Sequence, residues 1–177
     1  MQKLFNITNE TDHIVKIELV NGKKHNPLSL ELIKDLTNSL IQISSQKKVK
    51  VLIISSEGPG FSAGHDLDEL RKNKNNKKFF NELFNECSNL MQTIMNLPQP
   101  VIAEVCGIAA AAGCQLVASC DLAVASEQAA FMTPGVNIGL FCSTPMVAVS
   151  RNLSRKKIME MLLTGEKLRA KDAVDYG

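Results

Sequence analysis

The chain has 177 residues, and 45% of them are hydrophobic, which is enough apolar material to bury a substantial core in one domain. Its formal net charge at pH 7 is +2, and the lysines are spread along the sequence, which argues against nucleic acid as a partner. No apolar run approaches the length of a membrane span. We therefore expect a globular domain over residues 1–177 that neither binds nucleic acid nor spans a membrane.

The cysteines and the first residues bear on the compartment. Five cysteines, an odd number, lack the paired spacing of metal ligands, so we expect reduced thiols and no metal site. The N-terminal segment MQKLFNITNETDH has neither the apolar core of a signal peptide nor the arginine-rich, acid-poor pattern of a transit peptide. These features predict a cytoplasmic protein, or one of the mitochondrial matrix if a presequence lies outside this chain.

Strand and helix patterns alternate through the first half of the chain. Residues 13–20 have the period-two pattern of a strand, and residues 28–43 have helical spacing with Pro27 near the start. Residues 49–55 form an apolar run that predicts a second strand. Residues 77–97 repeat apolar side chains at every third or fourth position, and the prolines that follow end this predicted helix.

The second half continues the alternation with shorter elements. Residues 101–106 have the composition of a buried strand, and residues 121–126 that of another short strand. Between them, the small side chains of residues 108–120 predict a helix packed closely against its neighbours. Three short helical patterns follow between residues 144 and 177. The predicted fold class is therefore α/β, in one domain.

Two glycine-containing turns expose backbone N–H groups where chemistry could use them. The segment AGHD at residues 63–66 follows a predicted strand and precedes a short helix that begins with acidic residues. In the second turn, a strand ends at Gly107 and a helix begins within a few residues, before Gly113. If the turns meet, one N–H from each could stabilise the negative charge developing on a single carbonyl oxygen. Spacing alone favours a simpler interpretation, in which glycine turns only connect elements.

Longer stretches of sequence identify a family. The segments GFSAGHDL at 60–67, PQPVIAEVCGIAAAAGCQLVASCDLAVASEQAAF at 98–131 and TPGVNIGL at 133–140 strongly resemble the crotonase family, the enoyl-CoA hydratase/isomerase superfamily. The resemblance runs from about Asn21 to the end of the chain. Within the superfamily, the segments GHDLDEL, AAGCQLVASCD and TPGVNIGLFCSTP are most similar to the enoyl-CoA hydratase domain-containing protein 3 group. The resemblance implies a spiral of ββα turns that binds acyl-CoA thioesters and polarises their carbonyl with two backbone N–H groups.

The resemblance also implies roles for individual residues. The two N–H groups would belong to His65 and Ala112, and coenzyme A would enter as part of the thioester ligand, with no permanently bound cofactor. Lys24 and His25 would lie near the phosphates or the adenine of coenzyme A, and Asn26 would brace the entrance turn. The thioester and pantetheine arm would be lined by Ala63, Asp66, Leu67 and Asp68.

The chain departs from the family at two positions where the family's hydratases carry glutamates, because Gln115 and Gly135 stand there. Hydration of an enoyl thioester needs one group that activates water and another that delivers a proton to the alpha carbon. Neither an amide nor a glycine can exchange protons near pH 7. Ordinary hydratase activity is therefore not expected.

The other ionisable residues near these motifs have structural interpretations. Asp121 could tie a turn, Glu104 could pair with a lysine, and Glu127 could face water. His65 could act in catalysis, or its ring could pack against the ligand or hydrogen-bond a loop carbonyl. Both interpretations of His65 remain open.

Three functions remain compatible with the sequence. The first is a divergent enoyl-CoA hydratase-like protein of fatty-acid metabolism. The second is a decarboxylase of malonyl-type thioesters that uses the oxyanion site and His65, because loss of carbon dioxide generates the enolate without a base. A similar AGHD turn occurs in methylmalonyl-CoA decarboxylases, although Cys142 replaces their tyrosine. The third is an acyl-CoA-binding or regulatory protein without turnover, which the joint loss at Gln115 and Gly135 favours.

The family normally continues beyond the position of Gly177, into helices that cover the CoA site and build a trimer. From this resemblance we expect the C-terminal helical region to be truncated in this chain. A homotrimer or a hexamer is implied if that region is present.

Overall fold

The strands of the protein form two sheets. The computed structural model describes residues 3–177 and contains a five-stranded sheet, the large sheet, with the order β1-β2-β3-β5-β7. A four-stranded sheet, the small sheet, has the order β4-β6-β8-β9. Within residues 3–177, antiparallel pairing occurs only at one edge of each sheet, between β1 and β2 and between β8 and β9. The strands are β1 (Phe5–Asn9), β2 (Ile14–Leu19), β3 (Val51–Ser56), β4 (Gly60–Ser62), β5 (Val101–Val105), β6 (Ile108–Ala110), β7 (Leu122–Ala125), β8 (Ala130–Met132) and β9 (Leu168–Arg169).

The helices follow the strands at regular intervals. Within residues 3–177, none of them is both long enough and apolar enough to cross a membrane. The α-helices are α1 (Leu30–Ser44), α2 (Leu67–Lys72), α3 (Lys77–Asn96), α4 (Ala112–Ser119), α5 (Ser143–Val149), α6 (Arg155–Thr164) and α7 (Ala170–Val174), and the short 3-10 helices are η1 (Gly22–Lys24) and η2 (Pro134–Ile138).

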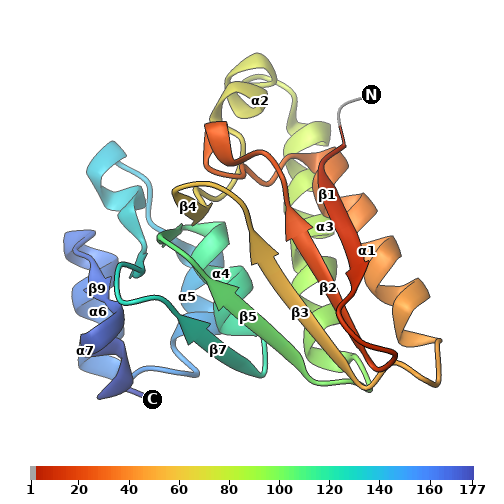
Figure 1. Ribbon diagram of the computed structural model, residues 1–177. Helices are drawn as coiled ribbons and strands as arrows, with labels where there is room; N and C mark the ends of the chain where they lie inside the picture. The colour runs from red at the N-terminus through yellow and green to blue at the C-terminus, as the bar shows by residue number, and fades with distance from the viewer. Residues whose placement is uncertain (1–2) are drawn as a thin grey trace.

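Successive segments of the chain repeat one pattern, in which a strand of the large sheet is followed by a strand of the small sheet and then by a helix. The repeats are β3-β4-α3, β5-β6-α4 and β7-β8-α5, with α2 and η2 inserted before two of the helices. Each repeat places its strands parallel to those of the repeat before it (Figure 1). This confirms the predicted α/β spiral of ββα turns.

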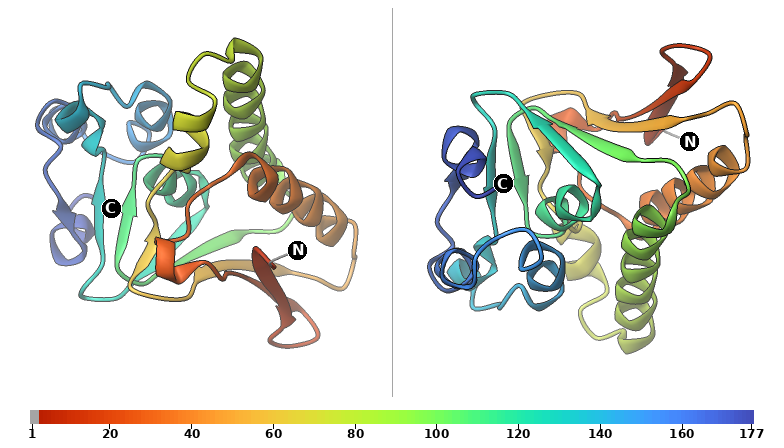
Figure 2. Two further views of the ribbon diagram at one scale, coloured as in Figure 1. Left: turned by 90° about the horizontal axis from the view of Figure 1, so that it is seen from above. Right: turned by 90° about the horizontal axis from the view of Figure 1, so that it is seen from below.

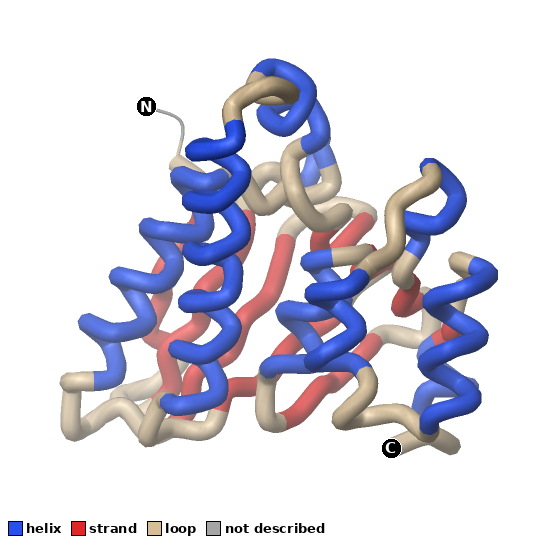
Figure 3. Tube along the Cα trace, turned by 180° about the vertical axis from the view of Figure 1, so that it is seen from behind, coloured by secondary structure: helices blue, strands red, loops and turns tan. Residues whose placement is uncertain are grey.

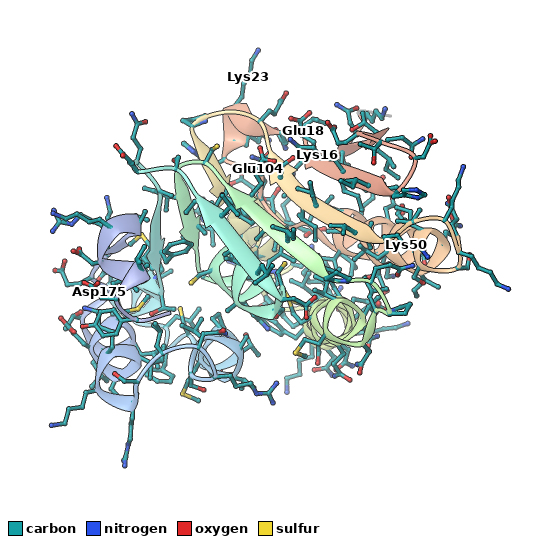
Figure 4. All side chains as sticks on the ribbon, turned by 60° about the horizontal axis from the view of Figure 1, so that its bottom comes forward. Lys16, Glu18, Lys23, Lys50, Glu104 and Asp175 are labelled. Carbon is teal, nitrogen blue, oxygen red and sulfur yellow. The ribbon has the colours of Figure 1, made fainter. Side chains whose placement is uncertain are left out.

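Helices cover one face of the large sheet. Viewed from behind, α1 and α3 lie across the strands (Figure 3), and they pack against the alternate side chains of β2, which bury Val15, Ile17 and Leu19. On the opposite face, Lys16 and Glu104 point away from the helices and form an ion pair of 2.9 Å (Figure 4). The C-terminal helices α6 and α7 lie beyond the β7 edge of the large sheet, on the side away from β1 (Figure 2). The main core therefore lies between the large sheet and its helices.

The structure corrects the predicted elements in the short segments. Residues 108–110 were predicted as the start of a helix because alanine has high helix propensity, but they form β6, which pairs with β4 and β8. A strand therefore separates Gly107 from α4, and the turn at Gly107 does not lead directly into the helix. The sequence analysis also missed β1, β4, β8 and β9. Sheet pairing outweighs local propensity in such short elements.

A buried asparagine ties together the turns that lead to the small sheet. Asn26 is fully buried, and its Oδ1 accepts a hydrogen bond from the N–H of Asn21 at 2.8 Å. Its Nδ2 donates to the carbonyl oxygens of Glu57 at 3.0 Å and Gly60 at 2.9 Å. The predicted bracing role of Asn26 is thereby confirmed, because one side chain satisfies three backbone groups from two turns.

We expect Asn26→Ala to lower the free energy of unfolding by about 2–3 kcal/mol, because it leaves buried backbone groups without hydrogen-bond partners. Urea unfolding followed by circular dichroism measures this change. Asn81→Ala is the matched control, since Asn81 is exposed on α3, and it should stay within about 0.5 kcal/mol of the wild type. Equal effects of the two substitutions would contradict the bracing role.

Candidate functional site

The two turns singled out in the sequence lie in direct contact. Gly64 has a φ of +87°, and a Cβ atom there would lie 3.0 Å from the backbone nitrogen of Ala112. A Cβ atom on Gly113 would lie 2.4 Å from the carbonyl oxygen of Ser62. Only glycine allows such an approach at both positions. The turn after β4 and the first turn of α4 therefore touch through their backbones.

Each of the two turns carries an N–H group that is not used by the fold. Ala112 is the first residue of α4, so its N–H has no acceptor within the helix. His65 follows Gly64, whose carbonyl oxygen accepts from the N–H of Leu28 at 2.8 Å. Between residues 3 and 177, no acceptor receives a hydrogen bond from the N–H of His65 or of Ala112. Two unpaired N–H groups on touching turns are what an oxyanion site requires.

The residue before α4 stores backbone strain at this point. Ala111 has a φ of 49° and a ψ of −119°, a conformation that L-residues rarely adopt. Its N–H donates to the carbonyl oxygen of Met132 in β8 at 3.0 Å, which holds the sharp reversal from β6 into α4. Strained backbone of this kind is concentrated at functional sites, where the surrounding structure holds it in place.

The residues assigned to coenzyme A lie at one end of the molecule, where η1, β4 and α2 meet (Figure 1). Lys24 and His25 are exposed, and the carbonyl oxygen of His25 accepts from the N–H of Ala63 at 2.8 Å. Leu67 is exposed on the first turn of α2. The structure thus brings these residues together around the turn at residues 63–66.

The two acids of this turn are engaged in local structure. Asp66 is the N-cap of α2, and its Oδ1 accepts from the N–H groups of Asp68 at 2.9 Å and Glu69 at 3.1 Å. The exposed carboxylate of Asp68 forms an ion pair with Arg71 at 3.3 Å. Both carboxylates therefore stabilise the first turn of α2, which begins two residues after His65.

The His65 side chain is held by two contacts. Its Nδ1 lies 3.4 Å from the carbonyl oxygen of Leu28, and its ring meets the ring of Phe84 edge-on at a centroid distance of 5.5 Å. Burial lowers the pKa of His65 below its usual value, which favours the neutral ring. Donation from Nδ1 to Leu28 leaves Nε2 as the acceptor, and Nε2 is buried without a partner among the described residues. The contact with the Leu28 carbonyl matches the loop hydrogen bond expected from the sequence, whereas the packing partner of the ring is Phe84 and packing against a ligand stays a prediction.

Gln115 lies one helical turn after Ala112 and borders a cavity. Its side chain is 7% exposed, and its Oε1 has no hydrogen-bond partner in residues 3–177. The cavity has a volume of about 260 Å³ and lies between α3, α4 and α5. Phe84, which contacts the His65 ring, lines the same cavity. The lining residues are Phe84, Cys87, Ser88, Met91, Gln92, Met95, Gln115, Ser119, Thr144, Val147, Ala148 and Arg151.

The sequence analysis missed this cavity except for Gln115. Its walls come from three helices that are far apart in the sequence, so no local motif marks them. The only signal was the apolar periodicity of residues 77–97, which indicates a packed helix face without showing that part of it borders a cavity.

At Gly135, where the sequence resemblance implies a missing glutamate, the space for a side chain is filled by the protein itself. A Cβ atom on Gly135 would lie 2.4 Å from the carbonyl oxygen of Leu140 and 2.8 Å from Sγ of Cys142. Real Cβ atoms do not approach other atoms so closely, so any side chain would displace the segment from Leu140 to Cys142. The segment from Leu140 to Cys142 therefore leaves no room for a side chain at position 135.

The remaining ionisable candidates have the structural surroundings foreseen in the sequence. Asp121 accepts from the N–H of Val101 at 2.8 Å, Glu104 pairs with Lys16, and Glu127 is exposed. Burial raises the pKa of the Cys114 thiol to about 12, so this cysteine is protonated and a poor nucleophile near pH 7. In residues 3–177, no three His, Cys, Asp or Glu side chains gather as a metal site would require.

Comparison with known proteins points to one family. A model of the family described as enoyl-CoA hydratase/isomerase matches residues 9–177. The human protein named enoyl-CoA hydratase domain-containing protein 3, mitochondrial, is 52% identical over 168 residues, which make up 95% of this chain and 55% of that protein. The rat protein of the same name is 49% identical over 170 residues, 96% of this chain and 56% of that protein. The chain spans little more than half the length of these relatives.

Solved structures agree with the sequence comparison. The crystal structure of the human domain-containing protein 3 matches with a TM-score of 0.94 and 49% identity, over 99% of this chain and 68% of that chain. The crystal structure of an enoyl-CoA hydratase from Mycobacterium smegmatis matches with a TM-score of 0.95 and 42% identity, over the same shares of the two chains. These similarities confirm the crotonase fold and the resemblance to the domain-containing protein 3 group.

We expect Gly135→Ala to lower the free energy of unfolding by about 2–3 kcal/mol, because the new methyl group overlaps the Leu140 carbonyl. Gly139→Ala is the matched control, since Gly139 has a φ of +75° and nothing within 4 Å of a Cβ atom. This control should lower the free energy of unfolding by only about 1 kcal/mol, from the strain of a non-glycine residue at a positive φ. Urea unfolding measures both variants. If Gly135→Ala is no less stable than the wild type, the position is not filled as described.

Proposed function

Because this chain belongs to the enoyl-CoA hydratase/isomerase family, we propose that it binds an acyl-CoA thioester and holds the thioester carbonyl oxygen between the N–H groups of His65 and Ala112. The observation that carries the proposal is the contact between their two turns, together with the absence of any protein acceptor for either N–H in the described chain. The positive end of the α4 dipole adds to the stabilisation of a negative oxygen. In enzymes with such sites, the loss of one donor costs about 2.7–4 kcal/mol of transition-state stabilisation.

The coenzyme A part of the thioester is proposed to lie at the end of the molecule where η1, β4 and α2 meet. The exposed Lys24 and His25 are suited to contact the phosphates or adenine of coenzyme A, since the backbone of His25 is hydrogen-bonded to Ala63 and Lys24 precedes it in the chain. Leu67 and the turn at residues 63–66 would line the pantetheine arm. The acyl group would enter the cavity between α3, α4 and α5, because Phe84 and Gln115 connect that cavity to the two N–H groups.

The site is proposed to stabilise an enolate without the usual means of proton transfer. Gln115 is an amide, and no carboxylate fits at Gly135, so neither position can activate water or deliver a proton. We infer a divergent enoyl-CoA hydratase-like protein of fatty-acid metabolism whose ordinary hydratase activity is weak or absent. The filled position at Gly135 specifically favours a second candidate, an acyl-CoA-binding protein without turnover.

Compartment and assembly are part of the same proposal. The human and rat relatives are named as mitochondrial proteins, which supports the mitochondrial matrix over the cytoplasm for the protein to which this chain belongs. The five free cysteines suit either compartment. A homotrimer or a hexamer remains a proposal that rests on the family alone.

The proposal is tested with three thioesters, crotonyl-CoA, methylmalonyl-CoA and butyryl-CoA, with free coenzyme A as the reference ligand. We expect calorimetry to show tighter binding of butyryl-CoA than of free coenzyme A, and spectrophotometry to show little or no hydration of crotonyl-CoA. Gln115→Glu alone should not bring hydration, because the second carboxylate position stays filled. Glu127→Gln, a change at an exposed residue, serves as the control variant.

The outcomes separate the candidates. If none of the thioesters binds more tightly than free coenzyme A, the proposed site is wrong. Rapid hydration of crotonyl-CoA that survives changes at both His65 and Gln115 would contradict the account of the missing proton carriers. Loss of carbon dioxide from methylmalonyl-CoA that disappears in His65→Gln would establish a decarboxylase instead, and binding without any turnover would establish the second candidate.

A further inference from the structure

The cavity between α3, α4 and α5 is lined at one end by residues beside the proposed thioester site and at the other by residues remote from it. Its near end, at Phe84 and Gln115, adjoins the turns that carry the His65 and Ala112 N–H groups. Its far end lies at Met95 and Arg151, whose side chains meet with Nη1 of Arg151 3.7 Å from Sδ of Met95. Eleven residues of α3 separate Phe84 from Met95, which corresponds to about 16 Å along the helix. The cavity therefore leads away from the proposed thioester site.

The walls of this cavity suit a chain of methylene groups. Apolar side chains line its length, from Phe84 through Met91 and Val147 to Met95. The hydroxyl and amide groups among them are partly engaged with the protein, since Gln92 donates to Ser88 at 3.1 Å and Ser119 donates to the backbone of Gln115 at 2.8 Å. An aliphatic chain could lie along the apolar wall without breaking the hydrogen bonds of Gln92 and Ser119, although Oε1 of Gln115 stays without a partner among the described residues.

The far end of the cavity carries a positive charge that the protein does not neutralise. Arg151 follows α5 and is exposed, and within residues 3–177 no carboxylate lies within 4.0 Å of its guanidinium. No aspartate or glutamate lines the cavity. By contrast, Arg71 and Arg169 pair with nearby aspartates. A cation at the end of a largely apolar groove is complementary to an anion at the end of an aliphatic chain.

We propose that this groove selects acyl groups that carry a carboxylate at the end remote from the thioester, that is, dicarboxylic acyl-CoA thioesters of medium chain length. This inference rests on the proposed thioester site, because it takes the near end of the groove as the point where the acyl chain enters. The chain lies along the wall from Phe84 to Met95, and its terminal carboxylate pairs with the guanidinium of Arg151. Since Arg151 is exposed, the carboxylate keeps part of its hydration and the gain in affinity is modest.

The test compares two ligands that differ only at the chain end, decanoyl-CoA and decanedioyl-CoA. Calorimetry on the purified chain should give about fivefold tighter binding for decanedioyl-CoA at low salt, and the preference should shrink as salt is added. Arg151→Gln should abolish the preference and leave the affinity for decanoyl-CoA unchanged. Arg155→Gln is the matched control, because Arg155 is an exposed arginine of α6 that does not line the groove, and it should keep the preference.

The outcomes distinguish this inference from the proposed function beneath it. If neither thioester binds, the thioester site itself is wrong. Should both bind with equal affinity, or should Arg151→Gln retain the preference for decanedioyl-CoA, the site stands and the selection by Arg151 is overturned.

Discussion

The candidate site depends on one contact, the close backbone approach between the turn after β4 and the first turn of α4. Two glycines make it possible, because a Cβ atom at Gly113 would overlap the Ser62 carbonyl, and Gly64 combines a positive φ with only 3.0 Å of space before the Ala112 nitrogen. The contact places the unpaired N–H groups of His65 and Ala112 on adjoining turns, and the strained backbone of Ala111 directs α4 into that position. Electrostatic preorganisation of this kind needs no side-chain chemistry, since the donors belong to the backbone.

Oxyanion stabilisation and proton transfer therefore depend on different parts of this structure. Stabilisation of a negative oxygen depends on the backbone contact, and that contact is present. Proton transfer depends on side chains, and at the two positions where the family resemblance implies carboxylates the chain has an amide, Gln115, and a glycine without room for a side chain, Gly135. The neutral, packed ring of His65 does not supply a charge in their place. We propose that the site binds and polarises a thioester and does not exchange protons with it.

The sequence was sufficient for the elements that have a repeating pattern. The alternation at residues 13–20 predicted β2, and the apolar spacing at residues 77–97 predicted α3. In each segment the period, of two residues or of three to four, repeats several times. It was also sufficient for the turn at Gly64, which has a positive φ, whereas the second turn was placed at Gly107 and lies instead after β6. The ionic partner of Glu104 and the bracing role of Asn26 were foreseen correctly.

The sequence was insufficient wherever structure depends on distant partners. Strands such as β4 and β6 have three residues each, too few for any period to appear, and the alanines of β6 favour a helix until pairing with β8 decides otherwise. The collision at Gly135 involves a loop whose path cannot be read from residue types. The cavity between α3, α4 and α5 arises only when three helices are packed together.

The most direct test of the central claim is the infrared spectrum of a bound acyl-CoA labelled with carbon-13 at the thioester carbonyl. Two hydrogen bonds to the carbonyl oxygen weaken its double bond, so we predict a lower stretching frequency in the complex than in aqueous buffer. Replacing the N–H of residue 112 with an ester oxygen, by incorporating lactic acid at that position, should reduce the shift, because it removes the donor without adding atoms to the close contact of the two turns. An unchanged frequency in a complex shown by calorimetry to have formed would contradict the claim that the N–H groups of His65 and Ala112 hold the thioester.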